Sequence, residues 1–328
     1  MILCLGPTPA VQRAMVFRRL AVDGVNRAAA TIDGAGGKSV NVAKVLHALG
    51  ESPLAMGFLG GERGAWLRSH LAQRGIAMKF VPVPAETRQC VTALDESSGT
   101  STELVEESRP VEATEYERLL SLFRERVGSC RATVMSGSLT PGGPADFYLR
   151  CTRAARKAGV LAVVDAQGPA LAEALKGNPD LVKPNRDELS VTMGRELPDE
   201  AAVQQAMRDL WELGARRVVV TGGKDPTLAF DGQRFWRVAP PRIAARNPIG
   251  SGDAVAAGLV WQLLRGADLG EACRWGTAAG SANALTRMAA EVTRADVERL
   301  ACEVRVEALQ PLQRAGSARP ASRLRKSA

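Results

Sequence analysis

Between residues 132 and 223, the chain alternates short apolar segments with segments of helical periodicity. Strand-length apolar segments occur in "ATVMSGS", "VLAVVDA", "DLVKPN" and "RRVVVTGG", and helical patterns such as "PADFYLRCTRAARKAG" and "AVQQAMRDLWELG" lie between them. This order predicts an α/β fold with a mostly parallel sheet and helices on both of its faces. Ligands of such folds gather at the carboxyl ends of the strands. Candidate residues at these ends occupy positions 136–138, 165, 183–185 and 221–223.

The composition excludes several other classes of protein. With 328 residues, of which 45% are hydrophobic, the chain can bury a sizeable core. Aromatic residues make up only 4%, which argues against stacking of single-stranded nucleic acid. Six cysteines without a C-x-x-C pair and only two histidines argue against a zinc site. We find no signal-peptide pattern and no run of about 18 apolar residues. We therefore expect a reduced, cytoplasmic protein.

Much of the positive charge lies near the C-terminus. The formal net charge is +8, but five basic residues follow Glu307, after which no acidic residue occurs. Residues 307–328 are rich in Pro, Ser, Ala and Arg, and we predict a disordered basic tail there. Such a tail can contact nucleic acid or a membrane. The composition favours a solvated, passive tail, so we expect neither partner.

Two segments break the alternation of strands and helices. Residues 11–32 contain apolar residues with Arg, Asp and Gly turns, and residues 87–108 alternate around the turn "ESSGTS", which is a hairpin signal. Neither segment is followed by a helix of its own. They are predicted to pair as a small extra sheet beside the main body.

The stretch "GAGGKSVNVAK" (34–44) resembles the end of a phosphate-binding P-loop at first sight. That motif requires a glycine at position 32, which is Ile32, so a true P-loop is not predicted. The following residues, "VNVAKVLHAL", predict a helix over 40–49. Its free N-terminal amides favour an anion at the glycine turn.

A second glycine turn begins in "NPIGSGDAVAAGLVWQLLRG", from Asn247. Gly250, Ser251 and Gly252 form a tight turn before a helix of small and apolar residues, and Asp253 falls in its first turn. A lone acid at this place is most simply an ordinary residue favoured by the helix dipole. Beside an anion hole, however, a carboxylate can deprotonate a hydroxyl that attacks a phosphate.

Four separated motifs identify a family resemblance. "GAGGKSVNVAKVLHALG", "SGSLTPG", "KPNRDEL" and "NPIGSGDAVAAG", in this order and spacing, resemble the ribokinase-like (PfkB) carbohydrate kinases over about residues 1–303. The match is closest to the branch of 1-phosphofructokinases, tagatose-6-phosphate kinases and the minor 6-phosphofructokinase. The resemblance implies a three-layer α/β/α core and a small β-sheet lid that covers the sugar and often forms a dimer interface. Mapped onto this chain, the core comprises 1–10, 33–86 and 109–306, and the lid comprises 11–32 and 87–108.

The resemblance also implies a catalytic centre and a nucleotide site for ATP with Mg²⁺. Asp253 is then the catalytic base, and Gly250, Ser251 and Gly252 form the anion hole. Asn185 and Glu188 of "KPNRDEL" would organise phosphates and metal-bound water, with Glu188 reaching Mg²⁺ through water. An amide and an acid three residues apart share one helical face, and Mg²⁺ suits a site with few protein ligands. The implied nucleotide-binding residues are Lys183, Asn185, Glu188, Thr221, Gly223, Gly250, Gly252, Thr277 and Ser281.

The glycine-rich stretch at 34–44 matches the family's site for the phosphoryl acceptor. Lys38 and Arg88 would bind a phosphate that the sugar already carries, because cationic side chains suit that role. Arg27 matches a basic residue that can reach a neighbouring subunit's site. The full set of acceptor-binding candidates is Gln12, Arg27, Gly36, Gly37, Lys38, Asn41, Arg88, Ser138 and Asp253.

The chain departs from the family pattern at four positions. Gln12 replaces an aspartate that binds sugar hydroxyls, Ser39 replaces a glycine and is expected to crowd the same pocket, and Cys90 replaces a polar residue. Pro226 stands where a turn glycine is usual, which would reshape the nucleotide loop. Three of these changes lie on the acceptor side, which suggests a shifted substrate because Asp253 and its glycines remain.

We therefore expect an ATP-dependent kinase of a phosphorylated ketohexose. Fructose 1-phosphate is the first candidate, followed by tagatose 6-phosphate and fructose 6-phosphate. The alternatives are a kinase of an unphosphorylated sugar or nucleoside, a non-catalytic sugar-phosphate sensor, and a nucleic-acid binder that acts through the arginine-rich tail. The sequence alone does not determine the oligomeric state, and the resemblance implies a homodimer through the lid.

Overall fold

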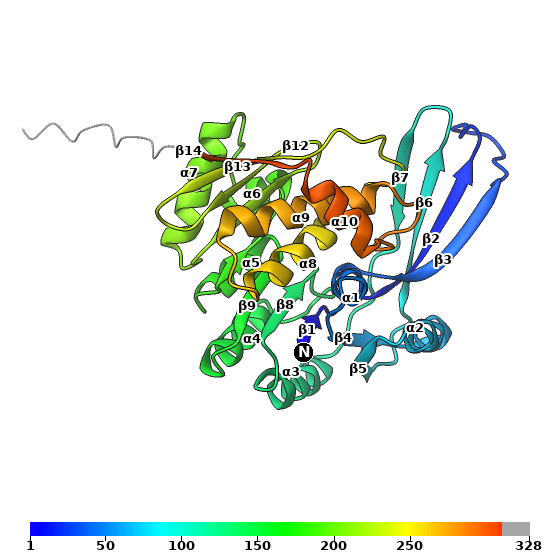
Figure 1. The fold of residues 1–328 in the computed structure, drawn as a ribbon. Helices are drawn as coiled ribbons and strands as arrows, with labels where there is room; N and C mark the ends of the chain where they lie inside the picture. Colours follow the sequence, from blue (N-terminus) through cyan, green and yellow to red (C-terminus); the bar gives the residue numbers. More distant parts are fainter. Residues whose placement is uncertain (310–328) are drawn as a thin grey trace, which may run out of the picture.

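A large twisted sheet forms the centre of the protein in the computed structural model, which describes residues 1–309 (Figure 1). The strand order is β14-β13-β12-β11-β10-β9-β8-β1-β4-β5. The seven strands from β5 to β11 are parallel, and the last three pair antiparallel. Their bounds are β1 Ile2–Leu5, β4 Pro53–Leu59, β5 Ala77–Pro82, β8 Ala132–Ser136, β9 Leu161–Asp165, β10 Leu181–Val182, β11 Val218–Gly222, β12 Asp225–Phe230, β13 Phe235–Ala239 and β14 Arg305–Leu309.

Helices cover both faces of this sheet, as the alternation in the sequence predicts. Successive residues of a strand point to opposite faces, so Ile2 and Cys4 join one apolar cluster and Leu3 and Leu5 join the other. One face carries α1 Lys38–Ala48, α2 Gly61–Gln73, α8 Ser251–Leu263, α9 Leu269–Ala284 and α10 Arg294–Ala301. The other carries α3 Ala113–Val127, α4 Phe147–Lys157, α5 Gly168–Leu175, α6 Arg186–Met193 and α7 Glu200–Glu212. The three-layer α/β/α prediction is confirmed.

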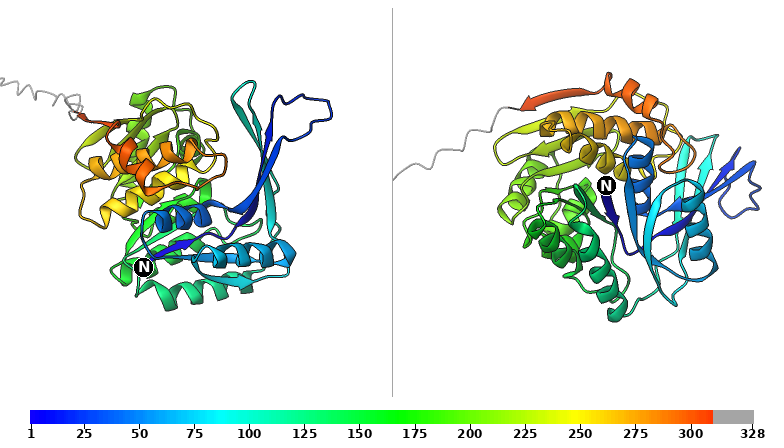
Figure 2. Two further views of the ribbon diagram at one scale, coloured as in Figure 1. Left: turned by 45° about the vertical axis from the view of Figure 1, so that its right-hand side comes forward. Right: turned by 60° about the horizontal axis from the view of Figure 1, so that its bottom comes forward.

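The small extra sheet is also present, and it projects from the body beside α1 (Figure 2). Its strands are β2 Ala10–Phe17, β3 Ala30–Gly36, β6 Arg88–Asp95 and β7 Thr100–Val105, in the order β3-β2-β6-β7. The parallel pairing of β2 with β6 joins the two irregular segments. Strand β3 continues to Gly36, because its main chain pairs with Ala10 of β2, so this sheet extends past the boundary expected at residue 32.

Some predicted boundaries were wrong. Strand β14 extends to Leu309, so residues 307–309 pair with β13 and are not part of a disordered tail. The rest of the predicted tail, 310–328, lies outside the described residues. The strand expected in "DLVKPN" is reduced to Leu181–Val182. None of the helices in residues 1–309 has the length and hydropathy needed to cross a membrane.

The topology determines where a site can form. From β1 the sheet grows to one side through β4 and β5 and to the other through β8 to β11. At such a reversal the connections leave in opposite directions and open a crevice at the carboxyl ends of the strands. Ser136, Asp165 and Lys183 stand at or directly after the ends of β8, β9 and β10. The sheet therefore gathers three polar residues that are far apart in sequence.

A buried lysine connects the two glycine turns. Lys44 of α1 is 3% exposed, and its Nζ donates to the carbonyl oxygens of Ala289 at 2.8 Å and Ala35 at 3.1 Å. Its ion pair with Glu291 measures 3.0 Å, and Arg74 contacts the second oxygen of Glu291. Burial lowers the pKa of Lys44, although Glu291 opposes this shift. The ammonium group thus joins α1, β3 and the segment after α9.

We predict that Lys44→Met destabilises the protein by about 3–5 kcal/mol, because two carbonyls and the partly buried Glu291 carboxylate lose their common donor, and Arg74 replaces it for Glu291 alone. The thermal and urea midpoints measure this loss. Lys176→Met is the matched control, because Lys176 is exposed and, among residues 1–309, forms an ion pair with Glu173 alone. This variant should cost less than about 1 kcal/mol. Equal stability of the two variants would contradict the role given to Lys44.

Candidate active site

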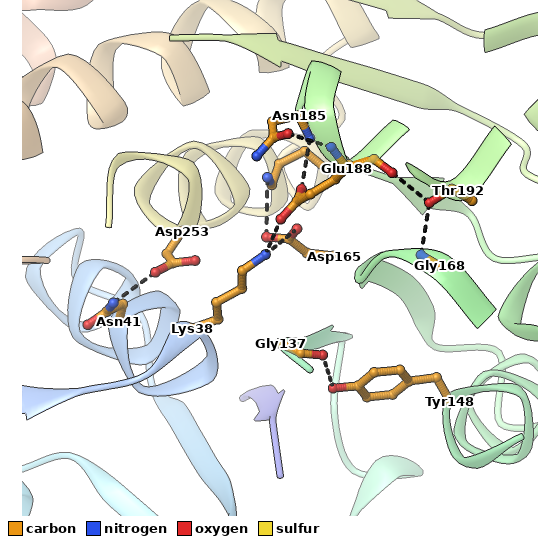
Figure 3. Close-up of polar contacts among 11 residues, drawn as sticks. Lys38, Asn41, Gly137, Tyr148, Asp165, Gly168, Asn185, Glu188, Thr192 and Asp253 are labelled. Carbon is orange, nitrogen blue, oxygen red and sulfur yellow. Dashed lines mark hydrogen bonds and ion pairs between the residues drawn. The ribbon is translucent and has the colours of Figure 1, made fainter. Parts of the chain in front are cut away.

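A polar cavity of about 300 Å³ lies between the carboxyl ends of the large sheet and the inner face of the small sheet. Figure 3 shows its polar centre. The lining residues come from both sheets, both glycine turns and the helices that follow them. They are Ala10, Gln12, Gly37, Lys38, Asn41, Arg88, Cys90, Glu103, Val105, Asp165, Lys183, Asn185, Glu188, Thr221, Ile249, Gly250, Gly252 and Asp253.

Asp253 is a buried carboxylate at the N-terminal end of α8. It is 6% exposed, and the Asn41 side chain donates to its Oδ2 at 2.8 Å. Burial raises the pKa of Asp253 to about 7, with a further upward contribution from Asp165. Lys38, the Asn41 hydrogen bond and Lys183 act in the opposite direction. A carboxylate with such a pKa can accept a proton near neutral pH, which suits a general base.

Asp165 lies between two lysines at the bottom of the cavity. The carboxylate is fully buried, with Lys183 Nζ 3.2 Å from Oδ2 and Lys38 Nζ 3.5 Å from Oδ1. Lys38 also donates to Glu188 Oε1 at 2.7 Å (Figure 3). Two acids therefore hold the Lys38 ammonium, and they raise the pKa of Lys38 against the effect of burial. Sequence analysis placed Asp165 at a strand end but gave it no role. An acid at the end of the apolar segment "VLAVVD" was the signal that could have marked it as a site residue.

Asn185 and Glu188 form a reciprocal cap at the start of α6. Asn185 Oδ1 accepts from the Glu188 amide at 2.8 Å, and Glu188 Oε2 accepts from the Asn185 amide at 2.9 Å. Asn-x-x-Glu before a helix is the pattern of such a capping box, and sequence analysis did not interpret it so. The Glu188 carbonyl accepts from Thr192, whose Oγ1 accepts from the Gly168 amide. This arrangement fixes the Glu188 carboxylate beside Lys38.

The turn at 248–252 presents backbone donors to the cavity. Gly250 has φ +81°, and a Cβ there would lie 2.9 Å from the Ala289 Cβ, so a larger residue would strain the turn. The Ser251 amide donates to the Pro248 carbonyl at 3.1 Å. Within residues 1–309, the structure gives no such partner to the amides of Gly252 and Asp253. These two amides, rather than that of Ser251, are available to an anion at the helix N-terminus.

The acceptor-side candidates partly converge. Gly37, Lys38 and Asn41 line the cavity from the first glycine turn, whereas Gly36 is buried within β3. From the small sheet, Gln12 donates to Thr92 Oγ1 at 2.9 Å, and Arg88 donates to the Thr8 carbonyl at 3.3 Å. The buried Nε of Arg88 has no hydrogen-bond partner among the described residues.

Ser39 does not crowd the pocket, contrary to the sequence prediction. Its side chain is buried on the opposite side of the turn, against Gly6. A Cβ on Gly6 would lie 2.5 Å from Ser39 Oγ and 2.5 Å from the Ser136 carbonyl oxygen. Ser39 lies in the first turn of α1 and points to the large sheet, so it packs this helix against the end of β1.

The structure does not bring the other predicted residues to this cavity. Arg27 is exposed in the loop between β2 and β3, and Ser138 is exposed after β8. Thr277 and Ser281 are buried in α9, where Ser281 Oγ donates to the Thr277 carbonyl at 2.8 Å. None of the four lines the cavity just described.

A second cavity, of about 580 Å³, adjoins the first at Asn185 and Thr221. Gly223 of the β11–β12 turn and Pro226 of β12 line it. Pro226 is the second residue of β12, so it lies after the turn itself, where the pairing of β12 with β11 is irregular. The turn instead uses Gly223, with φ +67°.

Sequence comparison supports the interpretation of these motifs. The profile described as pfkB family carbohydrate kinase matches residues 2–295. Tagatose-6-phosphate kinase from Staphylococcus epidermidis is 34% identical over 303 residues, a match that covers 89% of this chain and 94% of the relative.

Solved structures resemble the whole fold. Phosphofructokinase-2 from Escherichia coli, described in a tetrameric inhibited form, superposes with a TM-score of 0.82 at 31% identity. That match covers 92% of this chain and 98% of the other. A possible 1-phosphofructokinase from Thermotoga maritima gives a TM-score of 0.87 at 24% identity, over 94% of this chain and 99% of the other, which supports the fold alone.

Proposed function

This chain belongs to the pfkB family of carbohydrate kinases, and we propose that it transfers the γ-phosphoryl group of ATP to a hydroxyl of a phosphorylated ketohexose. The observation that carries the proposal is the position of Asp253, buried beside backbone donors at the start of α8 and beside Lys38 and Lys183. Fructose 1-phosphate, tagatose 6-phosphate and fructose 6-phosphate are the candidate acceptors. The names of the relatives above favour a sugar phosphate without selecting one of the three.

In the proposed reaction, Asp253 removes the proton from the acceptor hydroxyl. The hydroxyl oxygen forms a bond to the γ-phosphorus while the bond from that phosphorus to the bridging oxygen of ADP breaks. The amides of Gly252 and Asp253 bind the phosphoryl oxygens. The ammonium groups of Lys38 and Lys183 are held by ion pairs with Asp165, and Lys38 also by Glu188. They therefore stay in place as negative charge develops on the phosphoryl group. Preorganised donors of this kind need no rearrangement during transfer.

The nucleotide is assigned to the side of the cavity formed by Asn185, Thr221 and Gly223. Residues 1–309 contain no cluster of three or more metal-ligating side chains. Glu188 and Asp165 nevertheless line the cavity as carboxylates, which fits a magnesium ion held mainly by phosphates and water. Glu188 would hold that ion through water, and the ion would neutralise charge on the phosphates. Thr277 and Ser281 remain proposed for the adenine side.

Arg88 is the principal candidate for binding the phosphate that the acceptor already carries. It lines the cavity from β6, and its guanidinium has a buried nitrogen without a partner in the described residues. An arginine is well suited to bidentate phosphate binding. Lys38 lies between Asp165 and Glu188 instead, so we assign it chiefly to the group in transfer.

The small sheet is proposed to act as a lid and as the interface of a homodimer. Closure over the acceptor would exclude water, which otherwise competes for the phosphoryl group. Arg27 is exposed and lies outside the cavity of its own chain, which fits a contact with a second copy. Leu104 of β7 is 60% exposed on the outer face of the lid, where a second copy would cover it.

ADP release with ATP and magnesium, measured across phosphorylated and free sugars, tests the proposed activity. We expect turnover with a ketohexose phosphate and a loss of about 100-fold or more in the turnover of Asp253→Asn, because general-base catalysis typically contributes that much.

Arg88→Ala should raise the KM of the phosphorylated acceptor, because Arg88 is assigned to the phosphate of that acceptor. The KM of ATP should remain nearly unchanged.

Three results would contradict the proposal. Near wild-type turnover in Asp253→Asn would exclude the assigned base. Turnover confined to unphosphorylated sugars or nucleosides, unaffected in Arg88→Ala, would assign the chain to another kinase class. Binding of a sugar phosphate, with no ADP formed from ATP in the presence of any sugar, would indicate a sensor.

Light scattering after size exclusion measures the predicted assembly. We expect the wild type to have the mass of at least two chains, and Leu104→Asp to shift the protein towards one chain because it places a charge in an apolar interface. Val191→Asp is the control, since Val191 is 64% exposed on α6, which is not part of the small sheet. An unchanged mass in Leu104→Asp would refute the lid interface.

A further inference from the structure

Glu103 belongs to the edge strand of the small sheet and contributes a carboxylate to the cavity wall. Strand β7 pairs antiparallel with β6, and Glu103 lies directly opposite Thr92. Cys90 of β6 in turn lies opposite Gln12 of β2. Paired residues, and residues two positions apart on one strand, point to the same face of a sheet. Glu103, Thr92, Cys90 and Gln12 therefore share the face that closes the acceptor side of the cavity.

The acids in and next to the small sheet differ in what binds their carboxylates. Asp33 is paired with Arg13, Glu96 with Arg287, and Glu106 with Arg63. Asp95 accepts from the amide and the hydroxyl of Ser97. Glu103 makes no ion pair within the part of the chain that the structure describes. Partial burial raises its pKa, while the neighbouring Gln12 amide and Arg88 favour its ionised form. The carboxylate is thus left available at the rim of a polar cavity.

The neighbouring Gln12 cannot provide the same chemistry. Gln12 is 4% exposed, and its Nε2 already donates to Thr92 Oγ1 at 2.9 Å. An amide is neutral, whereas an ionised carboxylate only accepts hydrogen bonds and forms stronger ones. A carboxylate that faces a cavity beside Arg88 is therefore the natural acceptor for hydroxyl donors of a polyol ligand.

We propose that Glu103 binds one or two hydroxyl groups of the acceptor sugar and thereby sets which sugar is accepted. The assignment rests on the proposed function, since it presumes a hydroxylated acceptor in this cavity. Asp253 and Glu103 then stand on opposite sides of the acceptor: the first on the body, where transfer occurs, and the second on the small sheet. A site that hydrogen-bonds a hydroxyl rejects analogues that lack it, because the site's polar group is left unpaired.

The test compares wild type, Glu103→Gln and Glu103→Ala in steady-state turnover. The substrates are the most active sugar phosphate and analogues that lack or invert one hydroxyl at a time. We expect both variants to raise the acceptor KM about 10- to 100-fold, the range of a lost hydrogen bond to a charged group. The KM for ATP should change less than about twofold. Both variants should also lose discrimination at one particular hydroxyl while keeping it at the others.

Thr102→Ala is the matched control, because Thr102 is the adjacent residue of β7 and points to the opposite, outer face. It should keep the wild-type KM and sugar preference, and equal thermal midpoints show that all variants are folded. An active wild type whose sugar preference survives in Glu103→Gln and Glu103→Ala would overturn the assignment alone. A wild type that phosphorylates no sugar would overturn the proposed function and this assignment together.

Discussion

The site depends on a largely buried cluster of alternating charges, which lies where β9 and β10 end and where α1 and α6 begin. Asp165 holds Lys183 and Lys38, and Lys38 continues to Glu188. Each ammonium is stabilised by an acid and each acid by an ammonium, which offsets the large cost of removing isolated charges from water. Asp165 raises the pKa of Asp253, whereas Lys38 and Lys183 lower it. The fold therefore places a proton acceptor, with a pKa near neutrality, beside fixed cations that can bind a phosphoryl group.

Helix α1 connects this electrostatic centre to the rest of the molecule. Lys38 at its start reaches the acids, Asn41 one turn later holds Asp253, and Lys44 after a further turn holds the segment behind Gly250. Residues three or four apart lie on one face of a helix, so a single element aligns both glycine turns. The close approach of α1 to β1, where Ser39 packs on Gly6, sets the position of that helix. Displacement of α1 would disturb base, anion site and acceptor site together.

The sequence allowed the layer architecture, the small sheet and most lining residues of the cavity to be predicted, because strand and helix periods and glycine turns are local properties. Contacts across the fold were not accessible in this way. Asp165 gains its importance only when β8, β9 and β10 align, and the orientation of Ser39 depends on how α1 meets the sheet. Glu103 was not singled out, since an acid in an exposed, polar strand looks like a solvated charge until its partners on the sheet are known. The Asn-x-x-Glu pattern at 185–188 was visible in the sequence, but we assigned both side chains to phosphates and metal-bound water and did not recognise the helix cap that they form.

The pH dependence of kcat/KM, compared between wild type and Asp165→Asn with one sugar phosphate, tests the central claim most directly. Activity of the wild type should rise with pH through about 7, as Asp253 loses its proton. Asp165 raises the pKa of Asp253, so removing its charge should move this rise to lower pH. The phosphate of the acceptor titrates equally in both measurements and cannot produce a difference between them. An unchanged profile, or a shift to higher pH, would contradict the account of how this buried charge cluster tunes the base.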